Sequence, residues 1–288
     1  MISLIIAILT STAILLTFKI AAKKNVSTLQ SITFSYLTSA ILGFIFSSEG
    51  STINYIIQSN WFGWSILYGF FFICGFIVFG ICTTKCGISI TAISSRISAV
   101  IPILFGIFLF NDTLNNPMII GLLLALISLV LINLPDKKID KTTDKRSKLL
   151  TWLPILIFFI IGINDTIIKL AQAYLINNND YSEFICSCFL FSGVIGLIFM
   201  FINKEYKITL KSVITGITLG IFNYLNFKSL LIGLGQIQVS VFIPVYSICV
   251  VILSVLIGYF IFKEKISKTN LIGIITAILA ILLLTIKI

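Results

Sequence analysis

Five charged side chains lie inside or at the edge of long apolar stretches of this chain, and they are the groups best placed to do chemistry. They are Lys19, Arg96, Asp165, Lys169 and Lys228. Arg96 lies well inside its stretch, where a charge near mid-bilayer costs roughly 2.5–3.5 kcal/mol on insertion scales. We therefore expect Arg96 to face a polar cavity or a carboxylate. Binding of an anionic group is favoured, and a purely structural ion pair is the alternative.

Asp165 and Lys169 are four residues apart, so they share one face of a helix and can pair. Asp165 is a candidate coupling or counter-charge residue, unless the pair only holds helices together. Lys19 and Lys228 lie near the ends of their stretches, where snorkelling toward the headgroups explains them equally well. With Lys169, they are candidates for attracting an anion.

Uncharged polar residues accompany these charges and indicate a wet interior. Asn223 and Asn226 precede Lys228 on the same predicted helix, and Ser95 adjoins Arg96. We expect them to contribute to substrate binding. The alternative is that they join helices by hydrogen bonds, which Asn and Ser also do within membranes.

Composition fixes the structural class. Hydrophobic residues make up 58% of the 288 residues and charged residues 10%, whereas soluble domains carry roughly 25% charged residues. We predict an all-α integral membrane protein, because about 20 apolar residues span a bilayer as a helix. The first stretch is expected to be a retained helix. The ten predicted spans are Ile2–Ala21, Leu29–Ser47, Trp61–Cys82, Ile88–Phe110, Asn116–Asn133, Leu149–Leu170, Ser182–Ile202, Leu210–Ile232, Ile237–Phe262 and Thr269–Ile286.

The spans fall into two halves, residues 1–133 and 149–288, joined by a charged linker at 134–148. Aligning Phe110 with Phe262 places Asp112 on Glu264 and Gly121 on Gly273. The segment TFKIAAK aligns with IIKLAQA, which places Lys19 on Lys169. Five spans per half would invert one half relative to the other, an arrangement common in carriers with alternating access.

The basic residues orient the predicted spans. Fifteen of the twenty lie in the odd-numbered connectors or at their borders, and basic connectors stay in the cytoplasm. We therefore predict a multi-pass cell-membrane protein with a cytoplasmic linker and both termini outside. The net charge of +10 is thereby explained without nucleic acid as a partner.

The sequence lacks the residues that catalytic triads, zinc sites and disulfide frameworks require. The chain has no His, and its six Cys show neither zinc-site nor disulfide spacing. No catalytic residues, metal or cofactor are therefore predicted. Two other classes are alternatives. A membrane-embedded enzyme or lipid-modifying subunit would need a nucleophile or metal set, and a non-transporting sensor or assembly partner would have a dry, closed core.

These features resemble the EamA family of the drug/metabolite transporter superfamily. The resemblance rests on the five-plus-five spans, on Lys19 and Lys169, and on the acid and Gly that end each half, Asp112 with Gly121 and Glu264 with Gly273. One departure is Asn111-Asp112, where the family usually has Gly-Glu. The resemblance implies a carrier for small metabolites, with a cavity lined mainly by the first, third, fourth, sixth, eighth and ninth helices. Many relatives keep both termini in the cytoplasm, opposite to the charge count.

The sequence thus predicts a secondary carrier or exporter of small organic metabolites. An anionic or zwitterionic solute is favoured, such as an amino acid or organic acid. The expected partners are this solute, the lipid bilayer and, as a candidate coupling ion, the proton. A monomer or a homodimer is expected.

Overall fold

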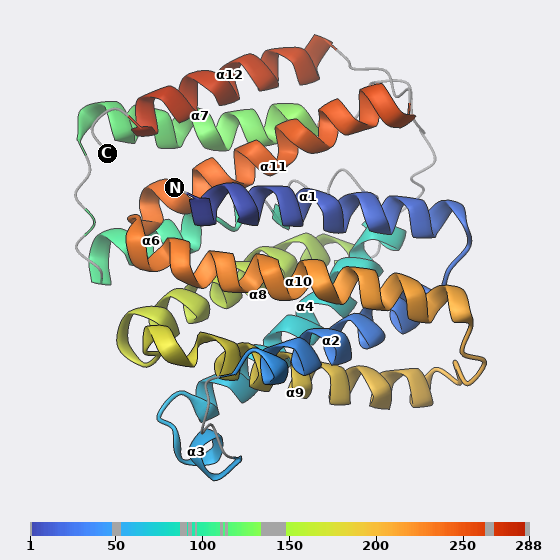
Figure 1. The fold of residues 1–288 in the computed structure, drawn as a ribbon. Helices are drawn as coiled ribbons and strands as arrows, with labels where there is room; N and C mark the ends of the chain where they lie inside the picture. The colour runs from blue at the N-terminus through green and yellow to red at the C-terminus, as the bar shows by residue number, and fades with distance from the viewer. Residues whose placement is uncertain are drawn as a thin grey trace. The chain divides into compact units, whose positions relative to one another are not determined.

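The structure is a computed structural model that describes residues 2–47, 53–86, 91, 94–95, 97–109, 112, 115–133, 148–262 and 268–285. Every regular element in these residues is a helix (Figure 1). In chain order they are α1 (Ile2–Lys23), α2 (Thr28–Ile45), α3 (Ile53–Gln58), α4 (Phe62–Cys86), α6 (Val100–Leu109), α7 (Asn116–Asn133), α8 (Lys148–Tyr174), the 3₁₀ turn η1 (Asn178–Asp180), α9 (Tyr181–Ile202), α10 (Leu210–Gln236), α11 (Val239–Phe262) and α12 (Lys268–Thr285).

The prediction of an all-α membrane protein is confirmed. Among the described residues, seven helices are long and apolar enough to cross a bilayer, and α6, α7 and α12 are shorter apolar helices. Each predicted span overlaps one of these ten helices. The short helix α3 lies in the second connector and was not predicted.

The fourth predicted span is not one continuous helix. A turn at Ser98–Ala99 precedes α6. Pro102 has no N–H to donate to the carbonyl four residues earlier, and the Ser98 carbonyl instead accepts from the Ile101 N–H at 2.9 Å. The Ser98 hydroxyl donates to the Ser95 carbonyl at 2.7 Å. The helical pattern is therefore interrupted at Ser98–Ala99, one turn after Ser95.

The start of α7 agrees with its sequence signal. The side-chain oxygen of Asn115 accepts from the Met118 N–H at 3.0 Å, and Pro117 occupies the first turn, where its missing N–H costs nothing. The helix therefore has the bounds expected for the fifth span, Asn116–Asn133.

The chain divides into two compact units that both draw on the two predicted halves. Unit 1 comprises residues 1–73 and 167–236, and unit 2 comprises residues 74–166 and 237–288. α4 and α8 contribute to both. The predicted halves, residues 1–133 and 149–288, are predicted as repeats in the sequence and not as packing units. That division therefore stays a prediction.

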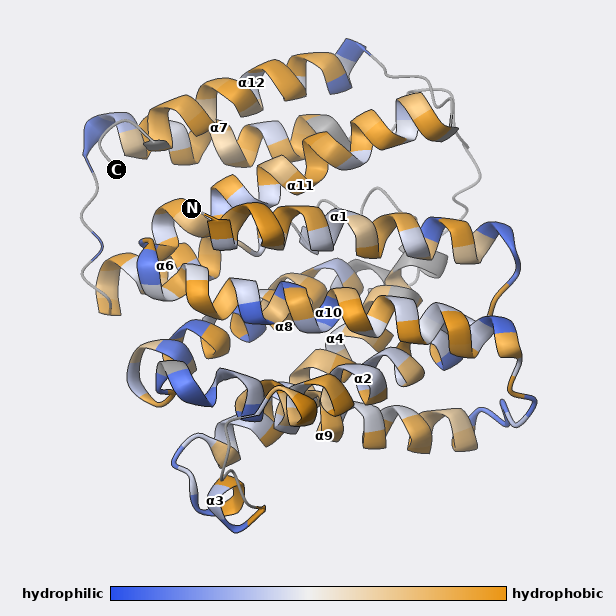
Figure 2. Cartoon of the chain, viewed as in Figure 1, coloured by the Kyte–Doolittle hydropathy of each residue, from blue (hydrophilic) through white to orange (hydrophobic). Residues whose placement is uncertain are grey.

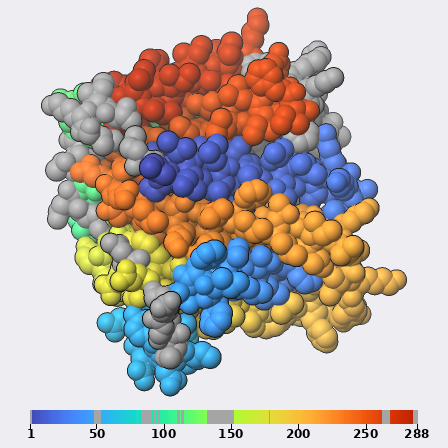
Figure 3. Space-filling model, in the orientation of Figure 1, coloured from blue at the N-terminus to red at the C-terminus, as the bar shows by residue number. Residues whose placement is uncertain are grey.

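In unit 1, α2 packs against α9 and α10, and α1 packs against α10. Figure 3 shows α1 and α10 side by side on the visible face. Gly216 and Gly220, four residues apart, lie on the α2 side of α10. A Cβ at Gly220 would lie 2.5 Å from the Thr38 Cβ, and one at Gly216 would collide with Phe34. The Ser39 hydroxyl donates to the Gly220 carbonyl at 2.9 Å, so small residues let the two backbones meet.

In unit 2, α7 packs along α12, as Figure 1 shows, and α11 contacts α6, α7 and α12. Asp112, an acid of the predicted repeat landmarks, caps α11. Its Oδ2 accepts from the Ser240 N–H at 2.9 Å and from the Ser240 hydroxyl at 2.8 Å. The first N–H groups of a helix lack partners within it and favour a negative charge. A Cβ at Gly106 would lie 2.8 Å from this Oδ2, so glycine makes room for the cap.

We expect Asp112→Ala to lower the free energy of unfolding by about 1–2 kcal/mol, the usual cost of losing an N-terminal cap. Thermal unfolding in detergent measures this. Gly106→Ala should produce part of the same loss by displacing the carboxylate, and the two changes together should be less than additive. An unfolding temperature unchanged by Asp112→Ala would contradict the capping role.

Candidate functional site

The side chain of Lys169 joins α8 to the end of α10. It is half-buried, and its Nζ donates to the Gln172 Oε1 at 2.9 Å and to the Leu234 carbonyl at 2.6 Å. Leu234 lies in the last turn of α10, where carbonyls lack helical partners and a cation is favourable. Lys169 therefore stabilises this helix end in addition to any role toward a solute.

Lys228 lies on α10 among hydroxyls and aromatic rings. It is half-buried, and its Nζ donates to the Ser182 hydroxyl at 3.2 Å and to the Tyr224 hydroxyl at 3.3 Å. The same nitrogen lies 5.6 Å from the ring centroid of Tyr224 and 5.9 Å from that of Phe46, within cation–π range. Snorkelling alone does not account for an ammonium held in this way.

The two lysines lie in one region, where the start of α9 meets the last turns of α10. A Cβ at Gly235 would lie 2.8 Å from the Gln172 amide nitrogen and 3.6 Å from the Tyr181 hydroxyl. Tyr181 and Ser182 are consecutive at the start of α9. We call this group the α8–α9–α10 polar cluster; its members are Lys169, Gln172, Tyr181, Ser182 and Lys228.

Glu183 adjoins this cluster and was missed in the sequence analysis. It lies in the first turn of α9 and is 0% exposed. Its position falls within the predicted span Ser182–Ile202, where a carboxylate is rare enough to be singled out. That rule would have found it.

A contact outside the spans borders this end of α9. The Tyr55 hydroxyl of α3 donates to the Asp180 Oδ1 at 2.9 Å. This hydrogen bond raises the pKa of Tyr55 above its ordinary value of 10.0; partial burial and the charges of Asp180 and Glu183 add to the rise. The phenol therefore stays protonated at physiological pH, and the contact persists there.

The predicted site asparagines make contacts between helices. The Asn223 amide donates to the Ser35 hydroxyl of α2 at 2.6 Å. The Asn226 amide donates to the Ala7 carbonyl at 2.8 Å and to the Thr10 hydroxyl at 3.2 Å, both on α1. These contacts match the alternative of helix–helix hydrogen bonding, and contact with a solute stays a prediction for both residues.

The remaining predicted site residues are spread over the two units. Lys19 is half-buried on α1 in unit 1, while Ser95 and Asp165 are half-buried in unit 2. Arg96 lies outside the described residues.

Asn164, next to Asp165, is 8% exposed, and its Oδ1 has no hydrogen-bond partner among the described residues. A buried amide oxygen of this kind calls for a hydrogen-bond donor.

No group of three or more potential metal ligands occurs among the residues that the structure describes. The side chains of Cys74, Cys82, Cys186, Cys188 and Cys249 are free thiols.

The fold and this distribution of buried charge define a polytopic helical membrane protein, and comparison with known proteins identifies its class. Residues 147–286 match the model of the EamA-like transporter family. An uncharacterized protein of Haemophilus influenzae is 29% identical over 97% of this chain and 96% of its own length. One crystal structure aligns with a TM-score of 0.77 at 12% identity, covering 98% of this chain and 94% of that chain, which shows a shared fold.

The second half of the chain thus matches the EamA-like transporter family, in agreement with the resemblance found in the sequence. It is a multi-pass membrane protein, and the family that its second half matches is one of transporters.

Proposed function

We propose that the protein is a secondary carrier of small organic solutes that works by alternating access, with anionic or zwitterionic solutes favoured. The observation that carries this proposal is the half-buried ammonium of Lys228, held by hydroxyls and rings within a membrane helix. Intramembrane charges of this kind mark solute and ion pathways.

The balance of charge favours an anionic or zwitterionic solute. Five basic residues lie in the predicted spans, with Lys211 at the border of its span, and Glu183 joins Asp165 to give two acids. Arg96 would bind the anionic group, and Lys19, Lys169 and Lys228 would attract it. Asp165 and the buried Oδ1 of Asn164 offer acceptors for an ammonium group. This acceptor side supports a zwitterion such as an amino acid.

Alternating access is supported by the packing of corresponding helices. In the predicted halves, α2 and α9 are both second helices, and α7 and α12 are both last helices. Each pair packs together within its own unit. A two-fold axis relating inverted repeats would bring equivalent helices together in this way.

The interrupted fourth helix also supports a carrier. Discontinuous helices form the solute sites of many transporters, because their freed backbone groups can meet the solute. Here the turn at Ser98–Ala99 lies next to Ser95 and close in sequence to Arg96.

Uptake by proteoliposomes tests the proposal. The purified protein would be given radiolabelled amino acids, organic acids and cationic drugs, with and without a pH gradient. We expect uptake of an acid or amino acid above protein-free vesicles, and gradient-driven accumulation if protons are coupled. Transport confined to the cationic drugs would overturn the favoured solute class.

Arg96→Ala should abolish uptake of the anionic solute while leaving expression and folding near normal. Arg96→Lys should restore only part of it, because a point charge replaces a planar fork that can bind a carboxylate twice. Initial rates in proteoliposomes and size-exclusion profiles measure the two effects. If Arg96→Ala fails to fold, the structural ion pair becomes the better account.

We further propose that the linker 134–148 is cytoplasmic and that both termini lie outside the cell membrane. A cysteine placed by Thr142→Cys should react with an impermeant thiol reagent only after the cytoplasmic face is opened, with the wild type as the background control. Labelling in intact cells would reverse this orientation. The protein is proposed to act as a monomer or a homodimer.

A further inference from the structure

Two connectors far apart in the sequence are fastened together at one end of unit 1. The Ser27 hydroxyl, which begins α2, donates to the Glu205 Oε2 at 2.6 Å. The Gln30 amide donates to the Lys207 carbonyl at 3.0 Å and to the Glu205 carbonyl at 3.4 Å. Gln30 is 4% exposed, so these bonds are shielded from water. The α1–α2 and α9–α10 connectors therefore present one joint surface.

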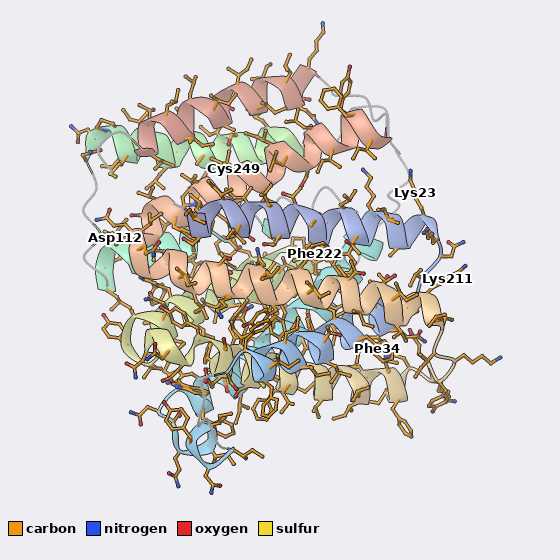
Figure 4. All side chains as sticks on the ribbon, in the orientation of Figure 1. Lys23, Phe34, Asp112, Lys211, Phe222 and Cys249 are labelled. Carbon is orange, nitrogen blue, oxygen red and sulfur yellow. The ribbon has the colours of Figure 1, made fainter. Side chains whose placement is uncertain are left out.

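This joint surface is strongly basic. Residues 23–30 and 203–211 contain five lysines and one acid, Glu205, so their net charge is 5 − 1 = +4. All five lysines are exposed. Figure 2 shows hydrophilic residues gathered at this end of α1 and α10, and Figure 4 labels Lys23 and Lys211 there. We call this surface the basic end; its lysines are Lys23, Lys24, Lys204, Lys207 and Lys211.

The single acid removes only one of the five positive charges of this surface. The Glu205 carboxylate accepts from Ser27 and is half-buried. The turn that carries it is tight, because Lys204 has a φ of 56°, in the left-handed region that most L-residues avoid. The basic end thus keeps a net charge of +4.

Exposed apolar side chains border the basic end. Phe201 is 71% and Tyr206 59% exposed, and their rings meet edge to face with centroids 5.6 Å apart. Ile208 and Leu210 are also largely exposed. Aromatic and lysine side chains side by side suit the boundary between headgroups and acyl chains.

We propose that the basic end is a binding site for anionic phospholipids, whose phosphate groups meet the lysines while their acyl chains cover the apolar border. A soluble anion would use only the lysines, so the apolar border is what selects a lipid. Clusters of four to eight basic residues beside a membrane helix commonly recognise anionic headgroups. This proposal does not depend on which solute is carried.

The test compares variants of the full-length protein for binding of phosphatidylglycerol and phosphatidylcholine, measured by native mass spectrometry and by thermal stabilisation in nanodiscs. Lys204→Gln, Lys207→Gln and Lys211→Gln together should weaken phosphatidylglycerol binding about 100-fold, at roughly fivefold per lysine. The same three positions changed to Arg should keep the binding. The matched control, Lys137→Gln, Lys138→Gln and Lys141→Gln, removes equal charge from the linker and should bind as the wild type does.

Three results would overturn the proposal. One is undiminished phosphatidylglycerol binding by the variant with three glutamines at the basic end. A second is an equal loss in the linker control, which would make binding a matter of net charge. The third is displacement of the lipid by millimolar inorganic phosphate, which would make the surface a site for soluble anions. Tyr206→Ala should lower lipid binding without altering the charge, and an unchanged affinity would count against the apolar border.

Discussion

Replacing Lys228 with methionine is expected to weaken transport of the anionic solute about 10- to 100-fold in apparent affinity. Hydrogen bonds to a charged group are worth about 1.5–3 kcal/mol, and methionine keeps the side chain's length while removing its charge. The fold should tolerate the change, because the Ser182 and Tyr224 hydroxyls still bond each other at 3.1 Å. The KM for uptake in proteoliposomes measures this effect, with the unfolding temperature measured in parallel.

The controls separate solute binding from structure. Lys228→Arg keeps the charge and should retain much of the affinity. Lys268→Met removes an exposed lysine at the start of α12 and should leave KM unchanged. If Lys228→Met lowers the unfolding temperature and leaves KM as it was, Lys228 serves only to fasten α10 to α9.

The helices were largely predictable because hydropathy averaged over about 20 residues detects a membrane span. Polar helix ends are where that average fails. α8 runs to Tyr174, beyond the predicted end at Leu170, and α10 runs to Gln236, beyond Ile232. The extra turns contain Gln172, which accepts from Lys169, and Gln236, which accepts from the Ser3 hydroxyl at 3.3 Å. The partner of Gln236 lies 233 residues away in the sequence, so no local window detects that contact.

The candidate site was predictable in residue type and less so in role. Lys169 and Lys228 stood out because charge in a span is costly. The structure places Lys169 against the last turn of α10 and Lys228 against Ser182 at the start of α9. Asn223 and Asn226 carry the same signal whether they line a solute path or join helices, and only the contacts with α1 and α2 separate the two. Asp112 was recognisable as a landmark of the repeat, but its partner Ser240 lies 128 residues away.

Asp165→Asn is expected to abolish gradient-driven accumulation while leaving solute exchange intact. Asparagine has the shape of the protonated acid and cannot release a proton, so it holds the site in one protonation state. A carrier that must load and unload a proton then loses the energetic link to the gradient, while exchange of internal for external solute needs no net proton movement. Accumulation under an imposed pH gradient and counterflow of labelled solute, measured on the same vesicles, distinguish the two activities.

Glu183→Gln is the matched comparison, because it neutralises the other carboxylate within the spans, which is completely buried in α9. We expect this variant to keep gradient-driven accumulation if Asp165 carries the proton. Loss of accumulation in Glu183→Gln with full accumulation in Asp165→Asn would transfer the coupling role to Glu183. An unchanged pH dependence in Asp165→Asn would leave Asp165 as a structural partner on α8. In that case, the most direct reason for an acid at position 165 would be that Lys169, which donates to the end of α10, lies one helical turn away.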